Sequence, residues 1–400
     1  MNTDIERLYQ IAGKSERLII GLMSGTSVDG LDVALCRLRG HGGNTEIELL
    51  HFDTVAYEAD FKAEIKSVFS KKEVDLEKLT LLNPWVALQH AGIINQCLQN
   101  WGVNKEAVDL IASHGQTIYH APKSLHGQAK FGNATLQIGD GDHLAMATGI
   151  ITISDFRQKN IAVGGEGAPL AVYGDYLIFG KKGEDRILLN IGGIANFTLL
   201  CGDMDAGKVF CTDTGPGNTM MDAYMQAQFP GQYYDADAAV AKQGQVHTGL
   251  LAALKNHSFF EQPFPKTTGP ELFNLDYLAQ AQALTGTTQL PVTDVMATLN
   301  RFSAETIVAA LLPYLRNMKD VKLFASGGGM HNPLLMEHIK AALPDVAFYT
   351  TDALRINPDA KEAVLFAVLA NECVAGQANT TGAGSKGFAP VLMGKISLPH

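Results

Sequence analysis

The chain has 400 residues, 46% of them hydrophobic and 18% charged, which excludes both a disordered chain and a single small domain. Its net charge is −10, and its 31 Lys and Arg residues form no basic run that could follow a phosphate backbone, so we expect no nucleic-acid partner. The apolar stretches are far shorter than the ~20 residues that cross a bilayer, and the polar start has no signal-peptide core, so we expect no membrane association and a cytoplasmic location.

Chain length and residue usage also bear on domain organisation. A chain of this size exceeds what one hydrophobic core usually organises, which predicts two lobes of about 150 to 200 residues. The 5 cysteines are scattered and form no C-x-x-C pair, which predicts buried thiols and neither disulfides nor a zinc site. The 40 glycines exceed the average share of about 7% and gather in a few clusters, where the backbone can approach a ligand.

Two glycine-tipped hairpins, one early in each half, indicate a duplicated building unit. An apolar run at 17–23 ends in the polar turn 24–30, and apolar residues then alternate through 31–36. The same strand, turn and strand return at 187–191 and 194–200, around Gly192 and Gly193. We therefore predict two similar lobes that face each other.

Between the hairpins, strands alternate with helices. Apolar spacing predicts a helix at 83–101 and a short strand at 109–112 that leads into the polar segment 113–117. A β-branched run at 150–153 stops at 155–157. These two polar segments place dense hydrogen-bonding groups, which sugar hydroxyls need, at the ends of two strands.

The middle of the chain contains a lobe boundary and an acidic strand end. The glycine cluster 164–169 opens a helix with Pro169 in its first turn, near the expected boundary. A strand from Lys208 is expected to end at Asp213, before a tight turn and a helix from Thr219.

The last third continues the alternation. We expect an amphipathic helix at 303–314, a strand at 321–325 that meets the glycine turn 326–329, a helix from Asn332-Pro333 and a final short strand around Val391. Alternating strands and helices predict an α/β fold with largely parallel strands.

The glycine turns are the main signal for nucleotide binding, because such turns expose successive backbone N–H groups to phosphate oxygens. The P-loop pattern is absent, and 139–141 and 165–167 lack the third glycine of a dinucleotide fingerprint. Any single turn could be an ordinary hairpin tip. Two similar hairpins together with the third cluster at 326–329 favour a three-part nucleotide cradle.

Four side chains are candidates for chemistry, and each has a structural alternative. Asp213 could act as a general base or could cap its turn. His114 could contact a ligand or be an interior histidine, and Arg157 could clamp a carboxylate or form an ordinary ion pair. Glu362 could face the ligand or simply favour the helix dipole at the start of the helix 362–370.

Taken together, the motifs carry a resemblance to a known family. They lie at 21–32, 113–117, 155–157, 164–170, 190–196, 213–218, 326–329 and 362–363. In these motifs, and in their order across nearly the whole chain, the sequence resembles the anhydro-N-acetylmuramic acid kinases, peptidoglycan-recycling sugar kinases of the actin, Hsp70 and hexokinase superfamily.

The resemblance implies an α/β fold of two lobes, the actin-like ATPase (ribonuclease H-like) fold, with duplicated mixed sheets flanked by helices and an interlobe cleft. The first lobe would comprise 1–154 with 377–400, and the second 155–376. Closure of the lobes around the ligands and a homodimer are also implied.

The resemblance further implies the reaction and its cofactors, ATP and Mg²⁺. Asp213 would deprotonate water, which attacks the anomeric carbon of 1,6-anhydro-N-acetylmuramic acid. The released O6 would then attack the γ-phosphate, giving N-acetylmuramate 6-phosphate and ADP.

The resemblance also assigns site residues. The ATP-binding residues would be Ser24, Gly25, Thr26, Ser27, Val28, Asp29, Gly30, Leu31, Asn190, Gly192, Gly193, Asn196, Gly327, Gly328 and Gly329. The sugar would face His114, Gln116, Thr117, Arg157 and Glu362. The wider superfamily has an Asp just ahead of the first Gly-Thr turn, where this chain has Met23-Ser24. Asp29, the nearest acid in the turn, is therefore the candidate Mg²⁺ ligand.

Three other functions stay open. The protein could phosphorylate another sugar, act as an actin- or Hsp70-like ATP switch, or bind nucleotide without turnover. Against the switch, the sequence shows no peptide-binding domain after the ATPase core. Release of ADP without added sugar would favour the switch, and sugar-dependent release would favour a kinase.

Overall fold

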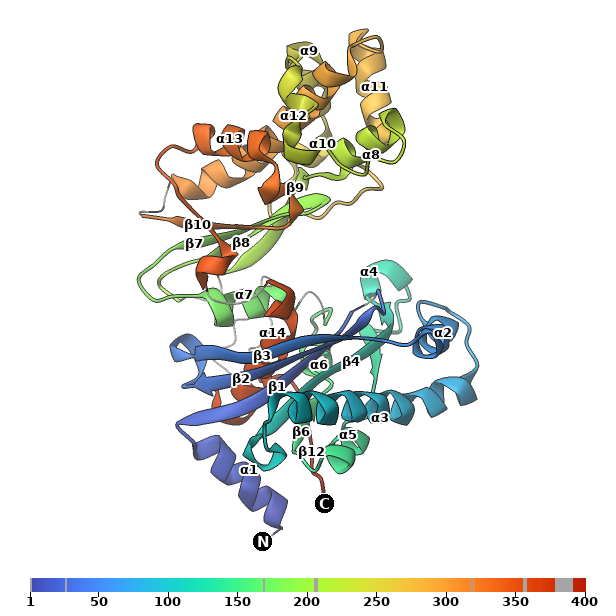
Figure 1. The fold of residues 1–400 in the computed structure, drawn as a ribbon, viewed down its shortest axis with the longest axis vertical. Coiled ribbons are helices and arrows are strands. Elements are labelled where there is room, and N and C mark those ends of the chain that lie inside the picture. Colours follow the sequence, from blue (N-terminus) through green and yellow to red (C-terminus); the bar gives the residue numbers. More distant parts are fainter. Residues whose placement is uncertain are drawn as a thin grey trace. The chain divides into compact units, whose positions relative to one another are not determined.

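The computed structural model describes residues 2–25, 27–167, 170–204, 208–316, 318, 320–354, 358–377 and 391–400. The chain divides into two compact units, drawn in Figure 1. The first comprises Met1–Gly180, Asp205–Gly207 and Ile356–His400, and the second comprises Lys181–Met204 and Lys208–Arg355. Both chain termini lie in the first unit.

The first unit is built on one mixed sheet. Its strands are β1 (Glu16–Ser24), β2 (Gly30–Arg39), β3 (Glu46–Ala56), β4 (Leu110–Ala121), β5 (Ala134–Ile138), β6 (Thr152–Ser154) and β12 (Lys395–Ser397). They are ordered β12-β6-β4-β1-β2-β3, and β5 pairs with β4. The neighbours β1, β2 and β3 are antiparallel, whereas β4 runs parallel to β1 and β6 runs parallel to β4.

The second unit repeats the central part of this plan. Its strands are β7 (Arg186–Ile191), β8 (Ile194–Leu200), β9 (Phe210–Pro216), β10 (Lys322–Ser326) and β11 (Ala347–Thr350). They are ordered β11-β10-β7-β8-β9. The neighbours β7, β8 and β9 are antiparallel, whereas β10 runs parallel to β7 and β11 runs parallel to β10. This order matches β6-β4-β1-β2-β3, which confirms the predicted duplicated mixed sheets. The separate expectation of largely parallel strands is wrong, because each unit begins with an antiparallel meander.

Helices cover both faces of the first sheet. They are α1 (Thr3–Gly13), α2 (Ala59–Val68), α3 (Leu76–Trp101), α4 (Lys123–His126), α5 (Gly141–Thr148), α6 (Arg157–Ala162), α7 (Ala171–Phe179) and α14 (Lys361–Ala375). Ile20 and Leu22 of β1 pack in one cluster with Ile94 of α3. Alternate residues point to opposite faces, so Gly21 faces the other way. A Cβ there would lie only 1.9 Å from the carbonyl oxygen of Ala363, and this glycine therefore lets α14 lie directly on β1.

The position of α14 also moves the boundary between the units. We expected the second lobe to contain residues 155–376. In the structure, α14 contacts β1, β2 and β4, and residues 155–180 belong with the same unit. The compact units therefore divide at residues other than those expected for the lobes.

In the second unit, a long helix forms the centre of the core. The helices are α8 (Thr219–Gln228), α9 (Thr248–Lys255), α10 (Ser258–Glu261), α11 (Leu275–Thr285), α12 (Val292–Leu315) and α13 (Pro333–Ala342). By length and composition α12 could cross a membrane, but 78% of its apolar window is buried inside the protein, as in the core helix of a soluble protein. Asn332 caps α13 by accepting the N–H of Leu335, as its place before Pro333 predicts.

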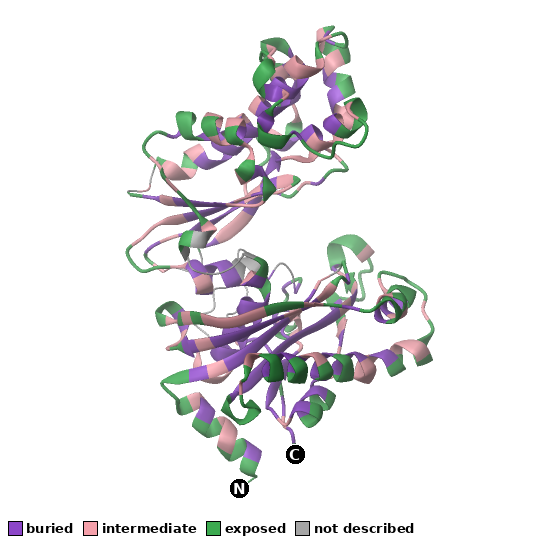
Figure 2. Cartoon of the chain, in the orientation of Figure 1, coloured by how far each residue is buried: buried purple, intermediate pink, exposed green. Residues whose placement is uncertain are grey.

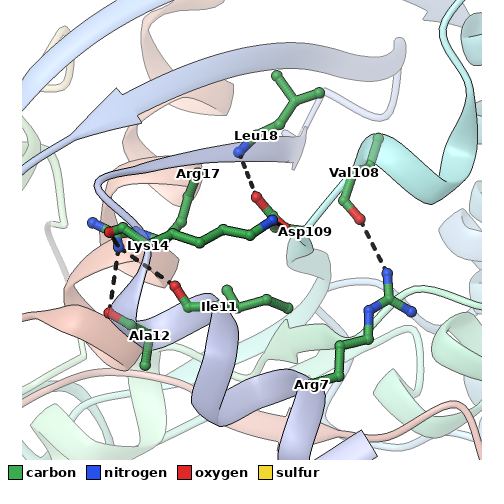
Figure 3. Close-up of polar contacts among 8 residues, drawn as sticks. All are labelled: Arg7, Ile11, Ala12, Lys14, Arg17, Leu18, Val108 and Asp109. Carbon is green, nitrogen blue, oxygen red and sulfur yellow. Dashed lines mark hydrogen bonds and ion pairs between the residues drawn. The ribbon is translucent and has the colours of Figure 1, made fainter.

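The N-terminal helix is fastened to the first sheet by a polar network (Figure 3). Lys14 pairs with Asp109 at 2.5 Å, and the second oxygen of Asp109 accepts the N–H of Leu18 at 3.0 Å. The buried Arg17 donates to the carbonyl oxygen of Lys14 at 2.6 Å and to the side-chain oxygen of Asn371 at 2.6 Å. This buried cation is thus satisfied by oxygens from both ends of the chain.

Several predicted boundaries differ from the structure. Residues 113–117 lie inside β4, and Asp213 lies inside β9 instead of ending it. The last strand is 395–397 and not around Val391. In each unit the buried residues gather along the strands (Figure 2). Of the cysteines, only Cys36 and Cys97 are fully buried, while the other three are partly exposed.

Candidate functional site

The tip of the β1–β2 hairpin carries the first predicted group of ATP-binding residues. The strands pair as far as Ser24 and Leu31, so Gly25 and residues 27–29 lie in the turn. Val28 has a positive φ of 57°, a strained conformation for a β-branched residue, while its side chain is buried. Asp29 is exposed, whereas Leu31 belongs to the core. Only backbone groups of Val28 and Leu31 are therefore available to a ligand.

A buried chain of hydrogen bonds supports this turn from below. Ser24 Oγ donates to Gln116 Oε1 at 2.5 Å, and Tyr57 Oη donates to Ser24 Oγ at 2.8 Å. His90 Nε2 lies 2.9 Å from Tyr57 Oη, and because the Tyr57 proton is already used, His90 is the donor. The amide nitrogen of Gln116 donates to the carbonyl oxygen of Gly25 at 3.3 Å. We call these residues the Tyr57 relay: His90, Tyr57, Ser24, Gln116 and Gly25.

The Tyr57 relay changes the expectation for two predicted residues. Burial lowers the pKa of His90 to about 4, so its ring is neutral. Gln116 is fully buried and both ends of its amide are engaged, so it links β4 to the hairpin instead of presenting a free amide to a sugar. Ser24 uses its hydroxyl as both donor and acceptor within the relay. No sequence motif pointed to Tyr57 or His90, which are far from the glycine turn in the chain.

His114 and Arg157 form a second pair in the first unit. Arg157 donates through Nε at 3.1 Å and Nη2 at 3.0 Å to His114 Nε2, which must therefore be the acceptor. The Nδ1–H of His114 then donates to the carbonyl oxygen of Gly115 at 2.9 Å. Burial, assisted by the Arg157 charge, lowers the pKa of His114 to about 3. His114 thus orients Arg157 and is not a base near neutral pH.

The strand β4 bends where these residues meet the hairpin. Gly115 has a φ of 72°, and a Cβ there would lie 2.5 Å from the carbonyl oxygen of Ile138. The pairing of β1 with β4 shifts register at the same place, which lets His114 and Gln116 both lie near Ser24. Beyond this bulge β4 pairs with β5 from Gln116 to Ala121, so the strand continues past its predicted end.

Glu362 and Thr117 complete the predicted sugar residues. Glu362 lies in the first turn of α14 and is exposed. Desolvation raises its pKa and so does Asp32, while Lys361 and Arg157 act in the opposite direction. The charges of Asp32 and Arg157 therefore both act on this carboxylate. Thr117 is partly exposed, and its hydroxyl accepts a 3.2 Å hydrogen bond from Gln137.

In the second unit, the β7–β8 hairpin packs against the start of α8. The carbonyl oxygen of Gly192 accepts the N–H of Asn218 at 2.8 Å, and that of Gly193 accepts the N–H of Gly217 at 2.8 Å. A Cβ at Gly217 would lie 2.3 Å from the Gly192 oxygen. The carbonyl groups at the tip of the hairpin thus hydrogen-bond to the start of α8, and the two segments are in direct contact.

The third glycine cluster joins the same hairpin. Gly327 has a φ of 81°, and a Cβ there would lie 2.6 Å from the side-chain oxygen of Asn190. A Cβ at Gly329 would lie 2.3 Å from the side chain of Ile191. Two of the three predicted glycine elements are therefore adjacent within one unit, as the cradle hypothesis requires.

A cavity of about 400 Å³ opens beside these glycines. It is lined by Asn218, Met221, Asp222, Tyr234, Asp235, Asp237, Gly328, His331 and Asn332. Asp235 is a structural residue, since its carboxylate accepts the N–H groups of Val240 and Ala241 at 2.9 and 3.0 Å. Burial raises the pKa of Asp222 to about 6. Of the lining residues, Asn218 and Gly328 belong to the predicted motifs 213–218 and 326–329, whereas no motif pointed to Asp222.

Asp213 lies in β9, opposite Asn196 of β8. Its Oδ2 accepts the N–H of Thr268 at 2.8 Å, and its own N–H donates to the carbonyl oxygen of Lys266 at 3.0 Å. Burial raises the pKa of Asp213, the Thr268 hydrogen bond lowers it, and the charge of Glu271 raises it further. A half-buried carboxylate with one oxygen held and a raised proton affinity is suited to accept a proton.

The model of the family described as anhydro-N-acetylmuramic acid kinase matches residues 17–397. The chain belongs to the anhydro-N-acetylmuramic acid kinase family. It is 60% identical over 400 residues to the protein of that name from Pseudoalteromonas atlantica, with 100% of both chains covered. It is also 37% identical over 399 residues to one from Caldanaerobacter subterraneus, covering 98% of this chain and 100% of the relative.

In this member of the anhydro-N-acetylmuramic acid kinase family, the predicted residues separate by unit. The first unit holds the hairpin residues 24–31 and all of the predicted sugar residues. The second holds Asp213, Asn190, Gly192, Gly193, Asn196 and 327–329. Thr26, Ala168 and Pro169 lie outside the described residues. The structure adds Tyr57, His90 and the cavity beside Gly328 to the family motifs, while the ligand roles of the predicted residues stay predictions.

Proposed function

We propose that this family member uses ATP to open 1,6-anhydro-N-acetylmuramic acid hydrolytically and to phosphorylate its O6, giving N-acetylmuramate 6-phosphate and ADP in cell-wall recycling. The observation that carries this proposal is the environment of the Asp213 carboxylate. Its carboxylate is partly buried, its pKa is raised, and one oxygen is fixed by Thr268. The other oxygen can accept the proton of a water molecule.

The base chemistry follows from that arrangement. Asp213 takes the proton as water attacks the anomeric carbon and the C1–O6 bond of the anhydro bridge breaks. The released O6 is the nucleophile for the γ-phosphate, and ADP is the leaving group. General-base assistance of this kind contributes about 10²–10⁴ in rate. The Thr268 N–H orients the carboxylate, and the raised pKa keeps Asp213 a stronger base than an exposed aspartate.

The glycine elements supply the phosphate and nucleoside contacts in this proposal. The hairpin turns at 25–29 and 192–193 offer backbone N–H groups to phosphate oxygens, whose developing charge is the main demand of phosphoryl transfer. The cavity beside Gly328 is large enough for part of a nucleoside and is contiguous with the glycine cluster 327–329.

Arg157 is proposed to hold the acid group of the sugar. Its guanidinium has five N–H donors, of which two go to His114 and one goes to the carbonyl oxygen of Gly167 at 2.7 Å. The remaining donors fit the carboxylate of a muramic acid, which a planar fork recognises well. Glu362 and Thr117, whose side chains reach solvent, are proposed to accept hydrogen bonds from the sugar.

Mg²⁺ is proposed to accompany ATP. No group of three or more metal-ligating side chains that could hold an ion occurs among the residues described. This fits Mg²⁺, which is commonly held by substrate phosphates, waters and one or two carboxylates. The exposed Asp29 would be such a carboxylate, and the ion would neutralise phosphate charge. A cytoplasmic homodimer without nucleic-acid or membrane partners completes the proposal.

Release of ADP from purified protein with ATP and Mg²⁺ tests the substrate. The proposal predicts rapid release with 1,6-anhydro-N-acetylmuramic acid and background release with N-acetylglucosamine, which lacks the acid group. Release without any sugar would indicate an ATP-driven switch. Release only with another sugar would indicate a different sugar kinase, and either result contradicts the proposal.

A further inference from the structure

Lys266 is a buried cation in the second unit, and only 8% of the residue is exposed. Its Nζ donates to the carbonyl oxygens of Phe259 at 2.8 Å and Phe260 at 3.3 Å. The same atom lies 4.5 Å from the ring centre of Phe259 and 4.7 Å from that of Phe264. It is ion-paired with no carboxylate in the part of the chain that the structure describes, and burial lowers its pKa. The charge is therefore held by carbonyl dipoles and aromatic faces.

The backbone of Lys266 is tied to the strand that carries Asp213. Its N–H donates to Thr212 Oγ1 at 2.9 Å, and its carbonyl oxygen accepts the N–H of Asp213 at 3.0 Å. The Thr212 hydroxyl also approaches the same carbonyl oxygen at 3.2 Å. Two residues further on, the N–H of Thr268 donates to the Asp213 carboxylate. The segment 266–268 is thus fixed at one end by the Lys266 side chain and holds the carboxylate at the other.

We propose that Lys266 is a positioning residue for Asp213: its ammonium group anchors the segment that aims the Thr268 N–H at the carboxylate. This inference rests on the proposed role of Asp213 as base. The Lys266 ammonium itself donates to the carbonyl oxygens of Phe259 and Phe260.

The cost of burying a charge supports a specific role. An unpaired cation in an apolar site is expensive, and a hydrophobic side chain of similar length would fill the same space without that cost. A methionine would pack among the phenylalanine rings but could not bond the carbonyl oxygens of Phe259 and Phe260. The hydrogen bonds of the ammonium group therefore fix the orientation of the segment 266–268, which apolar packing alone would not do.

The test compares Lys266→Met with the parent protein across pH. We expect kcat to fall about tenfold or more, the fold-change that corresponds to losing a hydrogen bond to a charged group, with KM for ATP unchanged. The Thr268 N–H stabilises the charged form of Asp213, so its loss raises that pKa. As the pH falls, the carboxylate should then be protonated, and activity lost, at a pH about one unit higher than in the parent protein. This low-pH side of the pH–activity profile is called the acid limb below. Glu271 is the charged group that acts on Asp213, and its charge is the same in the variant and the parent protein.

Matched variants separate positioning from packing. Lys266→Arg keeps a cation and should retain the parental acid limb. Lys255→Met removes an exposed lysine paired with Glu305 and should leave kcat and the pH profile unchanged. Thr212→Val loses the hydroxyl contacts to Lys266 while keeping the side-chain shape, and should shift the limb in the same direction as Lys266→Met.

The outcomes are distinct. An unchanged acid limb and kcat per folded molecule in Lys266→Met, with the folded fraction measured by circular dichroism, would overturn the inference. If Lys266→Met does not fold, an unshifted limb in Thr212→Val overturns it equally. Full turnover in Asp213→Asn would instead show that the proposed base is wrong, a result independent of how Lys266 behaves.

Discussion

Asp213 is the side chain on which the proposed chemistry depends most. Replacing it with asparagine keeps its size and removes the proton acceptor, so Asp213→Asn should preserve the fold and ATP binding. Turnover should fall by about 10²–10⁴. Steady-state kinetics with calorimetric titration of a non-hydrolysable nucleotide checks both statements, and near-normal turnover in a folded variant would rule out Asp213 as the base.

Glu271 should tune the same carboxylate. Its negative charge raises the pKa of Asp213, so Glu271→Gln should lower that pKa and move the acid limb of kcat/KM to lower pH. Because Glu271 is exposed, the shift should be below about one unit and should shrink as salt rises. A pH series at low and high salt measures it, and an upward shift would contradict the electrostatic assignment.

At the scale of elements, the Tyr57 relay joins α3, β1 and β4 beneath the first hairpin. Tyr57→Phe removes a donor to Ser24 and leaves the buried His90 N–H without its acceptor. This should cost about 1–3 kcal/mol of stability and raise KM for ATP by loosening Gly25.

Urea unfolding and steady-state kinetics measure both effects of Tyr57→Phe. Tyr9→Phe is the matched control, because Tyr9 is 78% exposed and should tolerate the change. Parental stability and KM in Tyr57→Phe would show that the relay does not support the turn.

The contact between β1 and α14 predicts another cost. Gly21→Ala would place a Cβ 1.9 Å from the carbonyl oxygen of Ala363, so the helix must shift. We expect a loss of about 1–3 kcal/mol, the usual range for overpacking a core. Thermal unfolding checks this, with Gly13→Ala as control because nothing lies within 4 Å of a Cβ there. Equal stability of Gly21→Ala and the parent would contradict the close approach.

The sequence predicted elements whose signals are local. The hairpins around 24–30 and 192–193 were found from glycine turns between apolar runs, and the α13 cap was found from Asn332-Pro333. The continuation of β4 was missed because residues 116–121 extend the strand by pairing with β5, which no local signal records. Tyr57, His90 and Lys266 were missed because their partners are distant in the chain, and no periodicity records such contacts.

At the scale of the whole molecule, the predicted duplication and the predicted family are both confirmed. Each unit carries the same five-strand order, and the relatives that define the family cover nearly the full chain. The unit boundaries were not predictable from composition, because α14 lies late in the sequence yet packs on the first sheet. Because this packing joins segments that are distant in the sequence, no local pattern near residues 154 or 376, the expected lobe limits, indicates it.

In the proposed reaction, one active site couples ring opening by water to phosphorylation at O6. Mass spectrometry of the product formed from ATP, Mg²⁺ and 1,6-anhydro-N-acetylmuramic acid in ¹⁸O-labelled water tests it most directly. We expect a ring-opened sugar phosphate that carries a single ¹⁸O atom from water. A phosphorylated sugar without the label, or an unchanged anhydro sugar, would contradict it.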